Sequence, residues 1–177
     1  MTFIVGAAPC ACPTQGDHKG SSLPGLFPWG LSTVDIESWE HTFITQQRVA
    51  RLATVDAQGQ PHVLPIVYAF EGQRLYTPLD AKPKRVDPRQ LQRVRNIQAN
   101  PHVAVIIDAY AEDWNRLAWV QLRGEAMLVE SGPVQARGVR LLEAKYDQYQ
   151  QLPLTGRPVI VITVQRVTSW RAAGAQV

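Results

Sequence analysis

The last apolar run of the chain, "RPVIVITVQRVTSW" at residues 157–170, places the strongest constraint on the fold. Successive side chains of a β-strand point to opposite faces of the sheet, so a strand that is apolar on both faces must be covered on both. The two alternating sets here are almost entirely apolar: Val159, Val161 and Thr163 on one face, and Ile160, Ile162 and Val164 on the other. We therefore expect this strand to lie inside a closed sheet or beneath a partner.

Five further runs read as β-strands, and turn residues or helical segments separate them. They span residues 48–56, 61–70, 73–79, 102–110 and 117–130. The short connections "AQGQ" and "EGQ" predict that the first three form an antiparallel meander. Pro65 cannot donate to a ladder, which predicts an edge or a bulge, and Gly124 marks a possible bulge in the fifth run. Six strands with short flanking helices predict a small, mainly β barrel of the α+β class.

Three segments have helical patterns, at residues 32–47, 87–98 and 132–149. Ser32 or Thr33 is the expected N-cap of the first helix. Asp87 and Pro88 form an N-cap and N1 pair for the second, and Pro133 opens the third. In the second helix the buried stripe consists of Leu91, Val94 and Ile97, which leaves the basic side chains displayed.

The stretch "TPLDAKPKRVDPRQLQRVRN" at residues 77–96 carries six basic and two acidic residues, whereas the whole chain has a net charge of only +3. Such a local excess suits a nucleic-acid backbone, a small phosphorylated ligand, or solvent alone. Nucleic acid fits poorly because no wider basic field or recognised motif accompanies the stretch. Lys82 and Lys84 precede a helix N-terminus at Asp87, an arrangement that suits a phosphate.

The length and composition indicate one domain at residues 32–177, preceded by an arm at residues 1–31 that is rich in Gly, Pro and Ser. Cys10 and Cys12 are the only cysteines, and with His18 they make too weak a pattern to predict a metal site. The arm lacks the features of a signal peptide, and no apolar run is long enough to span a membrane. We expect a cytoplasmic protein without a membrane partner.

No nucleophile stands out in the sequence, because the four histidines are scattered and the cysteines lie in the arm. Paired carboxylates, G-x-G-x-x-G and Walker motifs are also missing from the pattern. The catalytic residues therefore stay unknown at this stage, and any bound phosphate must be held by side chains.

The segment "RVARLATVDAQGQPHVLPIVYAF" resembles the first hairpin of the pyridoxamine-phosphate-oxidase-like split β-barrel flavoproteins: a strand ending L-A-T, a D-x-x-G turn, then P-H-x-x-P-[IV]. The segments "LYTPLDAKPKRV", "RVRNIQANPHVAVIIDAYAEDWNRLAWVQLRGEA" and "GRPVIVITVQRVTSW" are similar to the branch that uses coenzyme F420. This resemblance covers about residues 33–171. The chain ends "SWRAAGAQV" and lacks the R-L-x-P type motif of the true oxidases, which argues against vitamin B6 oxidation.

The resemblance implies a homodimeric split barrel of the FMN-binding type, with two cofactors in grooves between the subunits. It also implies a set of cofactor-binding residues, in which the basic side chains contact the phosphate or the ring edge: Arg48, Arg51, Leu52, Ala53, Thr54, Pro65, Ile66, Thr77, Lys82, Lys84, Arg93 and Asn96. Trp114, Trp119 and Trp170 could wall the ring pocket, although core or dimer packing is the alternative.

The resemblance therefore implies an oxidoreductase that transfers hydride between coenzyme F420 and a small organic substrate. The cofactor carries the hydride chemistry in such enzymes, so the protein needs little acid–base machinery. FMN is the alternative cofactor on the same fold. A non-catalytic flavin-binding or haem-binding protein is the alternative function.

Overall fold

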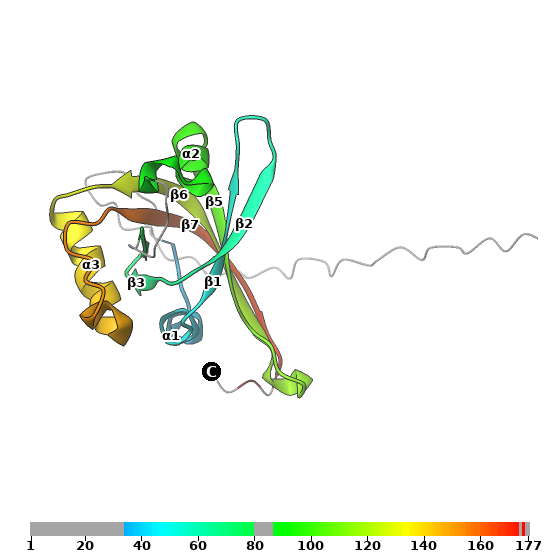
Figure 1. The fold of residues 1–177 in the computed structure, drawn as a ribbon. Coiled ribbons are helices and arrows are strands. Elements are labelled where there is room, and N and C mark those ends of the chain that lie inside the picture. Colours follow the sequence, from blue (N-terminus) through cyan, green and yellow to red (C-terminus); the bar gives the residue numbers. More distant parts are fainter. Residues whose placement is uncertain (1–33, 80–86, 174, 176–177) are drawn as a thin grey trace, which may run out of the picture.

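A computed structural model describes residues 34–79, 87–173 and residue 175 of the chain, and these residues form one antiparallel sheet with helices beside it (Figure 1). The strands lie in the order β2-β1-β5-β6-β7-β4-β3. Their bounds are β1 Ala50–Val55, β2 Pro61–Ile66, β3 Ala69–Glu71, β4 Arg74–Pro78, β5 His102–Ala109, β6 Ala118–Val129 and β7 Val159–Arg171. The helices are α1 Ser38–Gln46, α2 Gln92–Ala99 and α3 Pro133–Lys145, with 3-10 turns η1 Pro88–Gln90, η2 Trp114–Arg116 and η3 Asp147–Gln150.

The expected fold class, a mainly β barrel-like sheet with short helices, is confirmed, with seven strands in place of six. The extra strand arises because the run at residues 61–70 divides into β2 and β3. At the division Tyr68 leaves the sheet: its backbone N–H donates to the Tyr146 hydroxyl at 3.0 Å, and its own hydroxyl donates to the Ile44 carbonyl at 2.6 Å. A side chain that follows α3 and a backbone carbonyl of α1 thus bond to Tyr68, where a neighbouring strand would otherwise pair with it.

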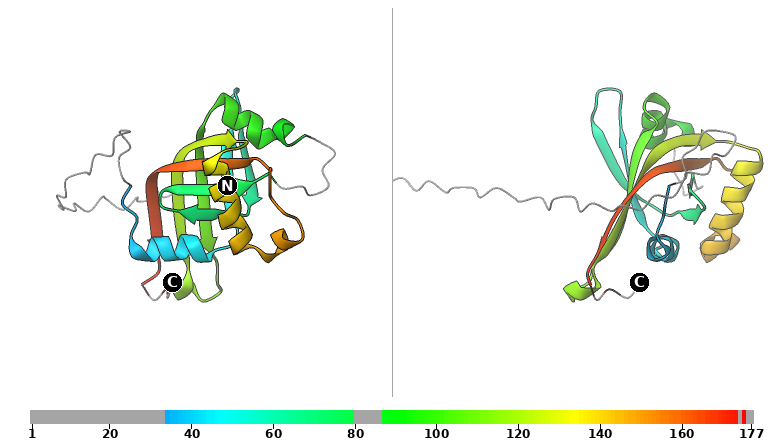
Figure 2. Two further views of the ribbon diagram at one scale, coloured as in Figure 1. Left: turned by 90° about the vertical axis from the view of Figure 1, so that its left-hand side faces the viewer. Right: turned by 180° about the vertical axis from the view of Figure 1, so that it is seen from behind.

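The predicted three-stranded meander is wrong for the same reason. β1 pairs with β2 and β3 pairs with β4, but these two hairpins lie at opposite ends of the sheet. The crossover at residues 67–68 carries the chain from one end to the other, and the curled sheet seen in Figure 2 brings β3 and β4 beneath the helices. Pro65 lies on the edge strand β2, where its missing N–H costs no ladder bond, as expected.

The prediction for the last strand is confirmed in the first half of β7. Ile160, Ile162 and Val164 join a core cluster with side chains of β1, β5, β6 and α1, while Val159 and Val161 face a second cluster with Val139 and other side chains of α3. The chain's own elements therefore cover both faces of this half. In the second half, exposed and half-buried side chains alternate from Arg166 to Trp170.

Gly124 lies at the predicted bulge, where the pairing of β6 with β7 shifts register between Arg123 and Gly124. A Cβ atom at Gly124 would lie 2.0 Å from the backbone oxygen of Thr163. Only glycine allows the two strands to approach this closely.

Two helix starts differ from the expected ones. Residues 34–37 are not helical, and α1 begins at Ser38 because Glu37 and Glu40 form a capping box: the Glu37 N–H donates to the Glu40 carboxylate at 2.8 Å. The second segment begins with η1, where the Asp87 carboxylate accepts from the Arg89 N–H at 2.9 Å, and the α-helix starts only after Leu91. The third helix opens at Pro133 as expected.

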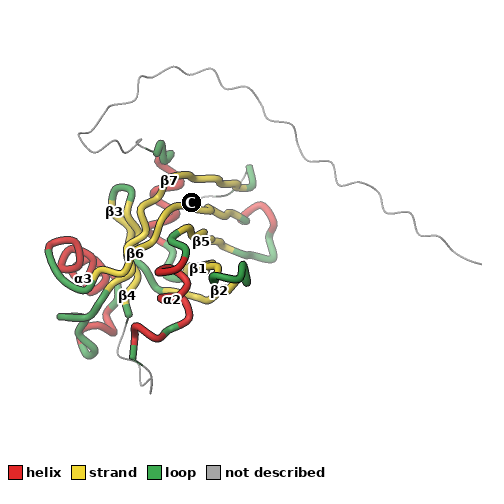
Figure 3. The backbone as a smooth tube through the Cα atoms, turned by 90° about the horizontal axis from the view of Figure 1, so that it is seen from above, coloured by secondary structure: helices red, strands yellow, loops and turns green. Residues whose placement is uncertain are grey.

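The helices gather on one side of the long strands, as the end-on view of Figure 3 and the two views of Figure 2 show. Within the described residues no helix covers the other side of β1, β5 and β6. No helix in this part of the chain combines the length and hydropathy needed to cross a bilayer. The uncovered sheet face is thus the natural place to look for a binding site.

Candidate functional site on the open face of the sheet

The uncovered face of the sheet is built from every second residue of β2, β1, β5, β6 and the second half of β7. On β1 the buried positions are Ala50, Leu52 and Thr54, so Arg51 and Ala53 between them face outward. The same alternation continues across β5 and β6. We refer to this surface, carried by the outward residues of these five strands, as the open face.

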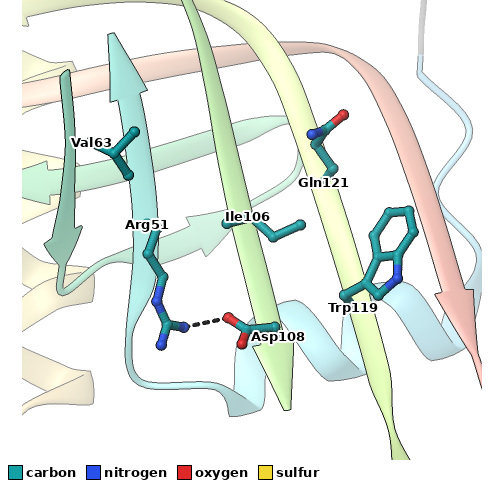
Figure 4. A pocket seen from close by; sticks show the side chains of 6 residues that line it. All are labelled: Arg51, Val63, Ile106, Asp108, Trp119 and Gln121. Atoms are coloured by element: carbon teal, nitrogen blue, oxygen red, sulfur yellow. Dashed lines mark hydrogen bonds and ion pairs between the residues drawn. The ribbon is translucent and has the colours of Figure 1, made fainter. Parts of the chain in front are cut away.

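The strand register brings polar and aromatic side chains of the open face into one patch. Ile106 on β5 lies opposite Arg51 on one side and Gln121 on the other, and Asp108 lies opposite Trp119. A pocket of about 590 Å³ lies over this patch (Figure 4), lined by Arg51, Val63, Ile106, Asp108, Trp119 and Gln121. We refer to it as the open-face pocket.

An ion pair closes one end of the open-face pocket. The Arg51 guanidinium donates to the Asp108 carboxylate from the neighbouring strand, two residues beyond the position directly opposite (Figure 4). Both side chains stay partly exposed, at 45% and 39%. An exposed pair of this kind contributes little to folding, so its groups remain available to a ligand that offers better partners.

Two predicted site residues, Thr54 and Asn96, do come together, but on the covered side of β1. The Asn96 amide donates to the Thr54 hydroxyl at 3.0 Å and accepts from the Gln92 amide at 2.7 Å. Asn96 and Thr54 are each only 1% exposed. They tie α2 to β1, so the Asn96 amide serves a buried contact within the protein and does not reach the open face.

The described residues of the predicted cofactor set are thus divided between the open face and the covered side of the sheet. Arg51, Ala53 and Pro65 belong to the open face, since Arg51 lies directly opposite Pro65. Leu52, Ile66 and Thr77 lie in the interior, and each is less than 10% exposed. Arg48 precedes β1 and stacks on the Tyr146 ring at 4.9 Å, on the side of α3.

The basic stretch is only partly described. Lys82 and Lys84 lie outside the described residues. Arg93 is half-buried on α2, while Arg89 forms an ion pair with Glu130 at 2.8 Å between Nε and the carboxylate. Within the described part of the stretch, the Arg89 charge is thus already paired with a carboxylate, which the sequence alone did not indicate.

Sequence reasoning missed Asp108 and Gln121 as functional candidates, and it weighed Trp119 only as one of three tryptophans. Asp108 is the only charged residue in the run "HVAVIIDAY", and this isolation was the available signal. Asp108 lies two residues after Ile106 on β5, so both side chains point to the same face of the sheet. The pairing of β5 with β1 places this face of β5 beside Arg51.

No group of three or more metal-ligating side chains occurs in the described ranges. The donor set of the open-face pocket instead suits an organic ring. Arg51 and Gln121 offer N–H donors, Asp108 and Gln121 offer acceptors, and the Trp119 indole offers an apolar wall. A dioxopyrimidine edge, which carries both carbonyl oxygens and an N–H group, matches these functions, so the residues present fit a flavin-type ring.

Solved structures of several proteins share this fold. A conserved hypothetical protein from Mycobacterium tuberculosis aligns with a TM-score of 0.63 and 20% identity over 80% of this chain and 89% of that chain. A haem storage protein from Vibrio cholerae aligns with a TM-score of 0.58 and 17% identity over 76% and 93%. A structure described as an F420 reductase aligns with a TM-score of 0.56 and 24% identity over 76% and 98%.

A comparison with curated protein sequences finds no match. The profile of the family described as Pyridoxamine 5'-phosphate oxidase matches residues 40–171, which is most of the chain and nearly the range over which its motifs resemble that superfamily. The fold agrees with this match in its curled antiparallel sheet and flanking helices. The chain therefore belongs to the pyridoxamine 5'-phosphate oxidase family and has the split β-barrel fold.

Proposed function

We propose that this protein is an oxidoreductase that transfers hydride between coenzyme F420 and a small organic substrate. The observation that carries the proposal is the open-face pocket, in which the Arg51–Asp108 ion pair, Gln121 and the Trp119 indole surround about 590 Å³. The fold shared with a structure described as an F420 reductase supports the choice of cofactor. FMN, which carries a related ring, is the alternative.

The side chains of the open-face pocket would bind and orient the ring. Arg51 and Gln121 would donate to its carbonyl oxygens, and Asp108 would accept from its N–H group. Trp119 and Ile106 would pack against the ring and keep water from one of its sides. The bound cofactor supplies the hydride chemistry, and the protein supplies position and electrostatics.

The phosphate of the cofactor is assigned to Lys82 and Lys84, with Arg93 as a third cation. Charge-assisted hydrogen bonds from ammonium groups to a phosphate are worth roughly 1.5 to 3 kcal/mol each. Because the two lysines lie outside the described residues, this assignment rests on the sequence and on the family.

We also propose that a second copy of this chain covers the open face. Val63 and Trp170 on this face are 61% and 47% exposed, although neither is polar. Apolar surface of this kind is typical of a protein–protein contact. A monomer mass in light scattering at micromolar concentration would rule this dimer out.

The test of the proposed function is a calorimetric titration of the full-length protein with coenzyme F420 and, separately, with FMN. We expect binding of at least one cofactor, and a loss of affinity of about tenfold or more in Arg51→Gln and in the double variant Lys82→Ala with Lys84→Ala. Arg140→Gln removes an exposed arginine of α3, away from the open face, and should bind as the wild type does.

Absorbance of the purified protein separates the alternatives. A yellow protein favours FMN, and a Soret band favours a haem-binding function. Failure of both cofactors to bind would contradict the proposal. Binding that Arg51→Gln leaves unchanged would place the ring elsewhere.

A further inference from the structure

A second pocket is lined by residues of α1, β3 and α3. These three elements lie together on the covered side of the sheet, away from the open face (Figures 1 and 2). It has a volume of about 240 Å³ and is lined by Thr45, Ala69, Phe70, Leu141, Ala144 and Lys145. Most of this lining is apolar, and Lys145 supplies its only charged group. We refer to it as the lysine pocket.

The amine of Lys145 is held in one position at the end of α3. Its Nζ atom donates to the Gln47 carbonyl at 2.7 Å and lies 4.2 Å from the centre of the Tyr68 ring and 5.7 Å from that of the Tyr146 ring. A fixed amine loses little rotamer freedom when it reacts. An exposed lysine on a free four-carbon stem has no such advantage.

The surroundings of Lys145 disfavour its charged form. The Arg48 guanidinium stacks on the same Tyr146 ring at 4.9 Å, and among the described residues no carboxylate forms an ion pair with either cation. Burial, together with the nearby Arg48 charge, lowers the pKa of Lys145 to about 8. Burial raises the pKa of the two facing tyrosines, so both stay neutral at this pH.

From this geometry we propose that Lys145 is an acylation site, which takes a short acyl group from a small activated donor such as an acyl phosphate. The Nζ lone pair attacks the acyl carbon, the new N–C bond forms, the carbon–oxygen bond to phosphate breaks, and phosphate leaves with that electron pair. The amine releases its proton to water. This inference concerns a different pocket from the proposed cofactor site and does not depend on it.

The product would satisfy the contacts that the amine now makes. An amide retains one N–H, which can still donate to the Gln47 carbonyl. The alkyl part of a two- to four-carbon acyl group fits the apolar lining of the lysine pocket. Acylation also removes one of two neighbouring positive charges, which relieves the repulsion with Arg48.

The chain offers its own reference groups for a test, because its only other lysines are Lys19, Lys82 and Lys84. The full-length protein is incubated with acetyl phosphate between pH 6.5 and 10, and peptide mass spectrometry follows the acetylation of all four lysines. An amine with a pKa of about 8 is roughly one tenth neutral at pH 7, against well under one thousandth for an ordinary lysine. Lower basicity offsets part of this gain, so we expect Lys145 to react about tenfold faster or more at pH 7.

Two variants distinguish the contribution of the pocket's shape to the reaction rate of Lys145 from that of the neighbouring Arg48 charge. Ala144→Leu fills part of the pocket from an exposed helix position and should slow the reaction of Lys145 alone. Arg48→Gln should move the midpoint of its rate profile to higher pH. The proposal is overturned if Lys145 reacts no faster than the other three lysines at pH 7, if its rate does not level off below about pH 9, or if Ala144→Leu has no effect.

Discussion

The two halves of β7 differ in burial, although they form one continuous strand. From Val159 to Val164 nearly every side chain is buried, because two core clusters lie on opposite faces. From Arg166 to Trp170 the strand alternates between exposed and half-buried positions, and its outward side chains belong to the open face. The first half holds the fold together, and the second half helps to present a surface.

The change between the halves coincides with a bulge in β7 itself, at Gln165. On β6, Arg123 lies opposite Arg166 and the next residue, Gly124, lies opposite Val164, so Gln165 has no partner of its own in the register. A bulge increases local twist and turns the following residues to a new direction. The long strands can thereby curl over the core at one end and stay open at the other, which is where the open-face pocket lies.

The largest expected loss of stability comes from a side chain placed at Gly124, where β6 and β7 approach closely. In Gly124→Ala the new Cβ would lie 2.0 Å from the Thr163 backbone oxygen, so the two central strands must separate and lose ladder bonds. We expect the free energy of unfolding to fall by about 4 kcal/mol in urea denaturation. Glu125→Ala, at the next and exposed position, should change it by less than about 0.5 kcal/mol. A loss below about 1 kcal/mol in Gly124→Ala would show that the strands are not held this closely.

Truncating one side chain in each half of β7 should show a smaller loss of stability, and the loss should differ between the two halves. Ile162→Ala removes a side chain that is 1% exposed and leaves a cavity in the main core cluster, at a cost of about 3 kcal/mol. Val167→Ala, in the second half, removes a half-buried side chain and should cost about 1 kcal/mol or less. Equal losses in thermal or urea denaturation would contradict the division of the strand into a core half and a surface half.

Much of this fold could be predicted from local patterns. The two-sided apolar run of β7, the glycine at the bulge and the proline on an edge strand each follow from the geometry of single strands. The positions of β3 and β4 could not be predicted in this way. They depend on Tyr68 and Tyr146, whose hydroxyl and backbone contacts join residues 78 positions apart.

The candidate site was harder to predict because it depends on register. Arg51 was identified, but its partner Asp108 comes from a strand 57 residues away, and only the pairing of β1 with β5 brings them together. Thr54 and Asn96 show the opposite difficulty, since a polar residue on a strand or helix can serve the core as well as a ligand. Strand parity separates Arg51 from Thr54 once the covered face is known.

On the open face, Trp119 and Trp170 lie directly opposite each other on β6 and β7. Substitutions of these two tryptophans can therefore be compared as variant and control. Trp119 lines the open-face pocket, whereas Trp170 does not. We expect Trp119→Leu to weaken cofactor binding about fivefold to tenfold in a fluorescence titration, because a flat aromatic wall is worth roughly 1 kcal/mol to a stacked ring. Trp170→Leu should bind within twofold of the wild type, and an equal loss in both variants would indicate a general effect of the face.

The smallest effect concerns the covered side, where Lys145 should make stability depend on pH. Its pKa is about 8 in the folded protein and near 10.5 in the unfolded chain, so between these values the unfolded state binds more protons. Stability therefore rises with pH in this window, and below pH 8 the contribution does not vary. Because the side chain is only partly buried, solvent screening should limit the rise to less than about 1 kcal/mol.

The measurement is the difference in the free energy of unfolding between wild type and Lys145→Met in urea denaturation at pH 7.5 and 9.5. The titrations of other groups largely cancel in this difference. The wild type should gain relative to the variant at pH 9.5. A relative loss there would mean that the Gln47 carbonyl and the two tyrosine rings favour the ammonium form of Lys145.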